Sequence, residues 1–162
     1  MNAIKNTAVW VNLWRVRDMH DIGKAVEKTI ISDITLIKGI STEIVKKLEG
    51  LQADPSDIFD IKLCVEEALR NAIEHGNAYD KNKKVNLRYA IDDGCFSMTI
   101  SDEGEGFDVH SVPNPVKKEN LLKAGGRGVY LISRLMDRAE YSNKGRELTI
   151  QKRFLKGKDN GA

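Results

Sequence analysis

The chain has 162 residues, which is enough for one domain with a hydrophobic core and short for two. Its 26 basic and 24 acidic residues nearly cancel and do not gather into one block, so the charge does not favour a nucleic-acid partner. Hydrophobic residues make up 41% and charged residues 31%, as in soluble globular proteins, and no hydrophobic run approaches the length that crosses a membrane.

Residues 1–23 have no periodicity that assigns them to one kind of element, and we treat them as an unassigned N-terminal extension. Val9 and Val11 alternate with polar or aromatic neighbours as in a strand, whereas Trp10 and Trp14 would equally anchor a helix. The stretch shows no small-residue cleavage site after a basic start. The two cysteines of the chain have neither metal-binding nor disulfide spacing, so we expect a cytoplasmic protein.

The next two elements are predicted to be a strand and an amphipathic helix. The segment from Lys24 to Ile31 is β-branched near its end and favours a strand. Ser32-Asp33 then resembles a helix cap, and apolar residues at helical spacing predict a helix from Ile34 to about Glu49, with Gly50 as its stop.

A longer helix is predicted from Asp60 to Asn77, after a capping turn at Asp54-Pro55-Ser56 and with Gly76 as its end. Its apolar residues recur at steps of three and four, the pattern of a helix with one buried face. These residues are Ile61, Cys64, Val65, Ala68, Leu69 and Ala72.

Glu67, Asn71 and His75 follow one another at intervals of one turn along the border of that apolar face. A carboxylate and an amide at the edge of a core need polar partners. The spacing therefore favours a polar ligand beside Glu67 and Asn71. From the helix alone, a solvated flank is the competing interpretation.

Alternating apolar residues next predict a β-hairpin, with strands at Val85–Ile91 and Phe96–Ile100 and an Asp-Gly turn between them. Regular patterns then fail from Glu103 to Gly128, and a loop of this length is usually a functional lid or a disordered link. The last predicted elements are a helix at 129–136 and two strands at 138–142 and 147–154.

This order predicts an α+β fold, a two-layer α/β sandwich in which a mixed, mostly antiparallel sheet carries helices on one face. We expect one domain over residues 24–155, followed by a polar tail at 156–162.

Two glycine clusters interrupt the pattern where a ligand would approach the backbone. The run Asp102-Glu103-Gly104-Glu105-Gly106-Phe107 stands where a strand leaves the sheet, and its carboxylate can accept a hydrogen bond from an exocyclic amine. An acidic turn or a calcium loop are alternatives, although the spacing does not fit an EF-hand. Gly125-Gly126-Arg127-Gly128 opens a helix and offers amide groups to a phosphate. A flexible hinge is the alternative there.

The three motifs together, E-x-x-x-N on a helix, D-x-G-x-G after a hairpin and G-x-G before a later helix, resemble the GHKL ATPase superfamily. The resemblance covers roughly residues 24–155. The sequences EEALRNAIEHGN, DEGEGFD and ENLLKAGGRGVYLISRLMD look most like the small anti-sigma factor serine kinases of bacteria.

The resemblance implies a role for each matching residue of the first two motifs. Asn71 corresponds to the asparagine that binds magnesium, which bridges the nucleotide phosphates. Glu67 corresponds to the acidic residue that acts as general base or orients the attacking group. Asp102 corresponds to the aspartate that accepts the adenine amino group, and Gly104 and Gly106 to the glycines beside the base.

The third motif is expected at the phosphates. Gly126 and Gly128 correspond to the second glycine box, and the segment from Val109 to Lys123 resembles the lid. Arg127 would touch a phosphate or be a solvated lid charge. His75 matches a His-Gly pair that we interpret as structural. One departure is Gly145-Arg146-Glu147, where the family often has a small hydroxyl residue near the phosphates.

The resemblance implies an ATP-dependent serine protein kinase that is also an anti-sigma factor. ATP and Mg²⁺ would be its cofactors. Its partners would be a sigma factor and an anti-anti-sigma factor, a small STAS-type protein that it phosphorylates on serine. A homodimer is expected, without a nucleic-acid or membrane partner.

Two other functions remain open at this point. The first is a non-catalytic ATP-binding module that captures a protein partner. The second is the catalytic half of a histidine kinase, which is disfavoured because His20 stands before a strand rather than on a long heptad helix.

Overall fold

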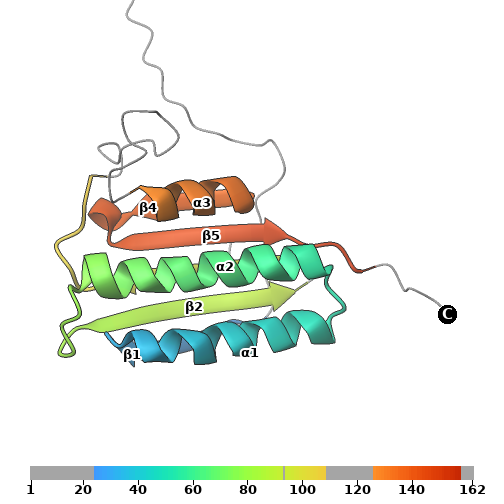
Figure 1. Cartoon of the computed structure of the whole chain (residues 1–162), viewed down its shortest axis with the longest axis horizontal. Helices are drawn as coiled ribbons and strands as arrows, with labels where there is room; N and C mark the ends of the chain where they lie inside the picture. Colours follow the sequence, from blue (N-terminus) through green and yellow to red (C-terminus); the bar gives the residue numbers. More distant parts are fainter. Residues whose placement is uncertain (1–23, 93, 109–125, 158–162) are drawn as a thin grey trace, which may run out of the picture.

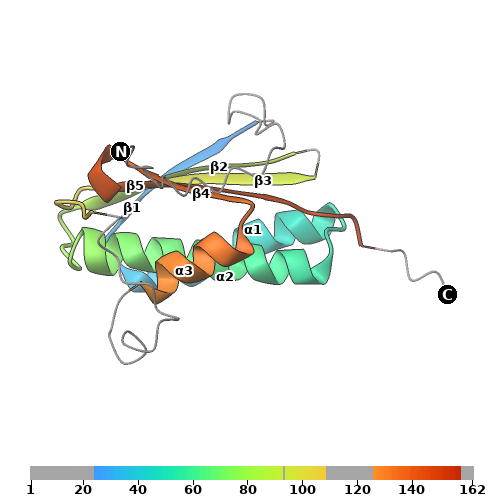
Figure 2. The same ribbon diagram turned by 90° about the horizontal axis from the view of Figure 1, so that it is seen from above.

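The computed structural model describes residues 24–92, 94–108 and 126–157. Within that part of the chain, five strands form one sheet and three α-helices cover one of its faces (Figures 1 and 2). This arrangement confirms the predicted two-layer α/β sandwich. The strands are β1 (Val26–Ile31), β2 (Lys84–Asp92), β3 (Cys95–Asp102), β4 (Arg138–Ser142) and β5 (Glu147–Arg153), and the helices are α1 (Ile37–Gly50), α2 (Pro55–Asn71) and α3 (Arg127–Leu135).

The sheet has the strand order β1-β2-β3-β5-β4, and each of these neighbouring pairs is antiparallel. The register aligns side chains in rows across the strands. In one row Tyr141 of β4 lies opposite Leu148 of β5, which lies opposite Ile100 of β3. Side chains of one row project from the same face of the sheet, so these three lie side by side.

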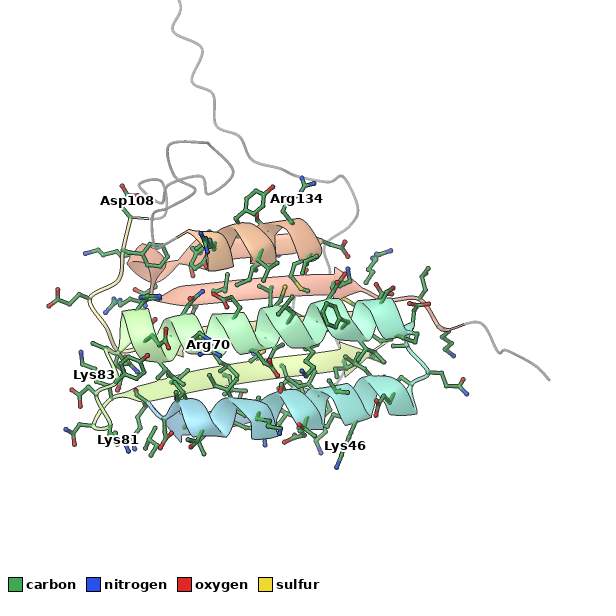
Figure 3. All side chains as sticks on the ribbon, viewed as in Figure 1. Lys46, Arg70, Lys81, Lys83, Asp108 and Arg134 are labelled. Atoms are coloured by element: carbon green, nitrogen blue, oxygen red, sulfur yellow. The ribbon has the colours of Figure 1, made fainter. Side chains whose placement is uncertain are left out.

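The hydrophobic core lies between the sheet and the helices. Most of the predicted alternating residues of β2 and β3 are buried, and Ala90 and Ser97 between them are buried as well. The predicted apolar face of α2 is buried along its whole length. Helix α2 lies between α1 and α3 in the helical layer (Figure 1). Lys46 of α1 and Arg134 of α3 mark the two outer edges of that layer (Figure 3).

The first helix differs from its prediction at both ends. Ile34–Leu36 form a 3₁₀ turn, and α1 begins only at Ile37. The reason is the Asp33 side chain, which accepts a hydrogen bond from the backbone N–H of Thr35 at 2.9 Å and so caps the tighter turn. Ile34 is consequently 42% exposed. At the other end Gly50 is still helical, and the chain turns after it.

The second helix begins at Pro55, within the predicted capping turn and earlier than Asp60, because the Asp54 side chain accepts a hydrogen bond from the N–H of Ser56 at 2.9 Å. It does not continue as an α-helix to Gly76. After Asn71 the backbone widens into a π turn over Ala72–Gly76, and the N–H of Asn77 donates to the Ala72 carbonyl at 2.8 Å. Such wide turns are rare and occur frequently at functional sites.

The buried side chain of Asn77 joins this turn to three other segments. Its amide nitrogen donates to the Ser32 hydroxyl and to the Lys84 carbonyl, both at 2.9 Å. Its amide oxygen accepts a hydrogen bond from the N–H of Glu103 at 2.8 Å. The residue is 0% exposed, so water does not compete for these bonds. Asn77 therefore fixes the end of α2 against the ends of β1 and β3 and the start of β2.

Within the described residues, no helix is both long enough and apolar enough to span a bilayer. The N-terminal extension 1–23 and the predicted lid from Val109 to Lys123 lie outside the described residues.

We expect Asn77→Ala to lower the free energy of unfolding by about 2–3 kcal/mol, because it removes buried hydrogen bonds and leaves the N–H of Glu103 without its acceptor. Urea denaturation would measure the change. The control is Asn86→Ala, which removes one exposed bond to Thr29 and should cost less than about 1 kcal/mol. Equal losses in the two variants would contradict the role given to Asn77.

Candidate functional site

A cavity of about 340 Å³ lies at the end of α2 where the π turn begins. Its walls come from α2, the π turn, the end of β3, the start of α3 and the hairpin of β4 and β5. Most predicted site residues line it, although they are distant in the sequence. These residues are Glu67, Asn71, Asp102, Gly106, Gly126, Arg127 and Gly128.

Asp102 forms one end of the cavity, where β3 leaves the sheet. The N–H of Gly104 donates to Asp102 Oδ1 at 2.8 Å and holds the carboxylate in place. A Cβ atom added at Gly76 would lie 2.3 Å from Asp102 Cγ, and one added at Gly104 would lie 1.9 Å from the Gly76 carbonyl oxygen. Only glycine fits at these two positions, so the π turn and the loop after β3 pack backbone against backbone.

Burial raises the pKa of the Asp102 carboxyl above its ordinary value of 3.8. The hydrogen bond from Gly104 and the positive charges of Arg146 and Lys83 oppose part of that rise. A carboxylate in these surroundings can accept a hydrogen bond from a ligand amine, which would replace the water that burial removes.

Glu67 and Asn71 line the cavity on α2, one turn apart, and α3 begins beside them. A Cβ atom added at Gly128 would lie 2.0 Å from Glu67 Oε1 and 3.0 Å from Asn71 Nδ2. The backbone of Gly128 therefore lies directly against both polar groups. The motif E-x-x-x-N and the second glycine cluster therefore lie side by side in the structure, although more than fifty residues separate them in the sequence.

The start of α3 is shaped by Gly126, whose φ of 76° lies in the left-handed region that glycine adopts without strain. The N-cap residue Gly126 has no side chain that could cap the amide groups of this first turn. Such an uncapped helix start, on the wall of a cavity, is suited to an anion. Arg127 is exposed at the same place. Gly125 lies outside the described residues.

Several cavity residues were not singled out as site residues from the sequence. Tyr141, Leu148 and Ile100 form its apolar floor, and the ring of Phe107 meets that of Tyr141 edge to face, with centroids 5.4 Å apart. In the sequence these residues carry only the alternation of ordinary strands. Gly76 was expected as a helix stop only, and its contact with Asp102 depends on the π turn.

The hairpin residue Arg146 also lines the cavity, beside Asp102. Its carbonyl accepts a hydrogen bond from the N–H of Asp102 at 3.0 Å, and its guanidinium donates to the Asn143 side chain at 2.8 Å. In the family this hairpin position is often a small hydroxyl residue near the phosphates, and the departure to arginine argues against a phosphate contact from the hairpin. The structure places it next to the carboxylate that was predicted to bind the base.

Among the predicted site residues, Gly104 alone does not line the cavity and instead supports Asp102 from behind. His75 lines the cavity and is exposed. The described residues contain no group of three histidine, cysteine, aspartate or glutamate side chains that could hold a metal ion. A cation here would depend on Asn71 and on ligand oxygens, and the binding roles of all these residues stay predictions.

Known proteins with similar sequences include serine-protein kinases. The chain is 30% identical to the serine-protein kinase RsbW of Bacillus subtilis over 107 residues, which cover 62% of this chain and 67% of that protein. It is 34% identical to RsbW of Staphylococcus aureus over 110 residues, with 62% and 68% covered. Against RsbW of Staphylococcus epidermidis the identity is 39% over 94 residues, and the chain spans 58% of that protein's length.

A solved structure, that of the RsbU and RsbW domains of a Mycobacterium tuberculosis protein, has the same fold. It matches 81% of this chain and 32% of its own, with a TM-score of 0.57 and 20% sequence identity. Residues 32–152 match the family described as the histidine kinase-like ATPase domain. The chain therefore belongs to the histidine kinase-like ATPase family, the GHKL fold, and within it resembles the anti-sigma factor serine kinases.

Proposed function

We propose that this protein is an ATP-dependent serine protein kinase and an anti-sigma factor. It would hold a sigma factor inactive and phosphorylate a small STAS-type anti-anti-sigma factor on serine, in the cytoplasm. The observation that supports this most is the meeting of Glu67, Asn71 and Gly128 on one wall of a cavity whose other end is Asp102. The sequence similarity to serine-protein kinases agrees with it.

The cavity offers different chemistry at its two ends, and a nucleotide needs both. Asp102 would accept the adenine amino group, and the apolar floor of Ile100 and Leu148 would pack beside the base. The uncapped start of α3, with Gly126 and Gly128, would receive the phosphates. A ligand with an amine at one end and negative charge at the other therefore fits this lining.

Asn71 would hold Mg²⁺ together with phosphate oxygens and water. Magnesium prefers oxygen ligands and often takes only one or two from the protein, which fits a wall without a cluster of acidic residues in the described part of the chain. The bound ion would neutralise negative charge on the phosphates. Gly128 leaves the space beside Asn71 free of a side chain.

Glu67 would accept the proton of the incoming serine hydroxyl, because its carboxylate lies beside the first turn of α3, where the phosphates would sit. Phosphoryl transfer depends on position and charge more than on covalent chemistry. We assign the kinase domain to residues 24–155, with 1–23 as an extension and 156–162 as a tail, and expect a homodimer.

The proposed function is tested by mixing the purified protein with labelled ATP, Mg²⁺ and a purified STAS-type antagonist. Phosphoserine on the antagonist supports a kinase. Nucleotide binding without any transfer would instead indicate an ATP-binding module that captures its partner. Absence of nucleotide binding at millimolar ATP would contradict both functions.

We expect Glu67→Gln to keep nucleotide binding and to lower the rate of transfer by on the order of 10² to 10⁴-fold, because the amide cannot accept the serine proton. The matched control is Glu66→Gln on the same helix. Glu66 bonds to Ser41 at 2.7 Å and pairs with Lys62, away from the cavity. Unchanged phosphorylation in Glu67→Gln would remove that residue from the role of base.

Gly128→Ala is expected to leave the protein folded and to lower ATP affinity and transfer at least about tenfold, because the new Cβ displaces the flexible end of Glu67 and crowds Asn71. Calorimetry and thermal unfolding would measure both effects. In the control Gly39→Ala, the added Cβ meets nothing within 4 Å inside α1, and stability should rise by about 0.5–1 kcal/mol. Phosphoryl transfer at the wild-type rate by the Gly128→Ala variant would show that ATP does not bind against this wall of the cavity.

For Asp102→Asn we expect opposite effects on stability and binding. The raised pKa means that the Asp102 carboxyl holds its proton more tightly in the folded protein than in the unfolded chain. The free energy of unfolding of the wild type therefore falls as the pH rises through that pKa. The variant should therefore be more stable than the wild type at pH 7. The difference between their free energies of unfolding should become smaller as the pH falls towards 4.

Nucleotide affinity should fall about ten- to hundredfold in the same variant. The Gly104 N–H occupies the remaining oxygen, so the amide nitrogen would face the adenine amine, donor against donor. Denaturation curves at several pH values and calorimetry with ADP would measure the two effects. Unchanged ADP affinity would contradict the role of Asp102 at the base.

A further inference from the structure

The hydroxyl of Tyr141 is buried at the cavity floor and makes no hydrogen bond within the described part of the chain. Buried polar groups in folded proteins are nearly always paired, because an unpaired group loses its bonds to water without replacement. An exception on the wall of a binding cavity therefore needs a reason. Nothing in the packing of the described residues supplies one.

The ring of Tyr141 is held in place, so its hydroxyl cannot easily turn elsewhere. Phe107 contacts the ring edge to face, with an interplanar angle of 74°. Leu148 is its cross-strand neighbour on β5, and the two lie in one row with Ile100. These contacts are apolar and offer the hydroxyl no partner, and they hold the side chain in a fixed orientation before a ligand binds.

The hydroxyl keeps its proton at physiological pH and can therefore donate a hydrogen bond to a ligand. Burial, and to a smaller extent the negative charge of Glu67, raise the pKa of Tyr141 to about 12. The hydroxyl thus stays protonated and neutral. Arg88 Nε is also buried without a hydrogen bond, but it lies outside the cavity and is 3.5 Å from a Glu27 oxygen.

We propose that Tyr141 is a nucleotide-binding residue whose hydroxyl donates a hydrogen bond to an acceptor atom of the bound nucleotide. The inference rests on the proposed function and adds a contact that none of the three motifs contains. The acceptor is either on the nucleoside, beside Phe107 and Asp102, or on the phosphates, towards Glu67. In the free protein the unpaired hydroxyl costs stability, and ligand binding would remove that cost.

The test is Tyr141→Phe, which keeps the ring and its packing and removes only the oxygen. We expect a three- to tenfold loss of ADP affinity by calorimetry, the size of one neutral hydrogen bond. Thermal unfolding of the free variant should occur at or above the wild-type midpoint, because the unpaired hydroxyl is gone. A structural role for the hydroxyl would instead lower the midpoint and leave affinity unchanged.

The matched control is Tyr79→Phe, whose hydroxyl already bonds to Glu74 outside the cavity and whose loss should leave ADP affinity unchanged. Repeating the titration with adenosine locates the acceptor. An equal loss for adenosine and ADP places it on the nucleoside, and a loss for ADP alone places it on the phosphates.

The outcomes separate the two proposals. If the wild type and Tyr79→Phe bind ADP and Tyr141→Phe binds it equally well, the role of Tyr141 is wrong and the proposed function stands. If the wild type itself binds no ADP, both proposals fall.

Discussion

The backbone contact between the end of α2 and the loop after β3 sets the dimensions of the site. A Cβ atom at Gly104 would collide with the Gly76 backbone, and a Cβ atom at Gly76 would collide with the Asp102 side chain. Asn77 holds this contact from behind through bonds to three segments. Since Asn71 stands on α2 and Asp102 on β3, the same contact determines how far apart the two ends of the cavity lie. The helical layer is thus locked to the sheet at the point where binding is proposed.

The polar groups of the cavity are distributed in a way that suits a small elongated ligand. Charged and amide groups line the cavity on α2, at the end of β3 and at the start of α3, and the strand residues Ile100, Tyr141 and Leu148 add apolar surface. A few placed polar groups around an apolar lining are usual for small-molecule sites. The buried carboxyl of Asp102 and the unpaired hydroxyl of Tyr141 both reduce the stability of the free protein. This loss of stability is explained if a bound ligand forms hydrogen bonds with both groups.

The sequence predicted those features that depend on local patterns. Apolar periodicity identified the buried face of α2, and alternation with an Asp-Gly turn identified the hairpin of β2 and β3. It did not predict the π turn, because the bonds of Asn77 to Ser32 and Glu103 at the end of that turn join residues far apart in the sequence and leave no local pattern. Tyr141 was missed for a similar reason, since only the register with Leu148 and the contact with Phe107 place it in the cavity.

The π turn also restricts how the chain can vary in length. Five residues separate Asn71 from Asn77. With one residue fewer, the segment would wind as an α-helix, and the Asn77 side chain would rotate away from its buried hydrogen-bond partners. The turn that follows is exposed from Ala78 to Asn82, and none of these residues supplies a side chain to the hydrogen bonds of Asn77. Insertions and deletions among homologues should therefore collect between positions 78 and 83 and be absent between 71 and 77.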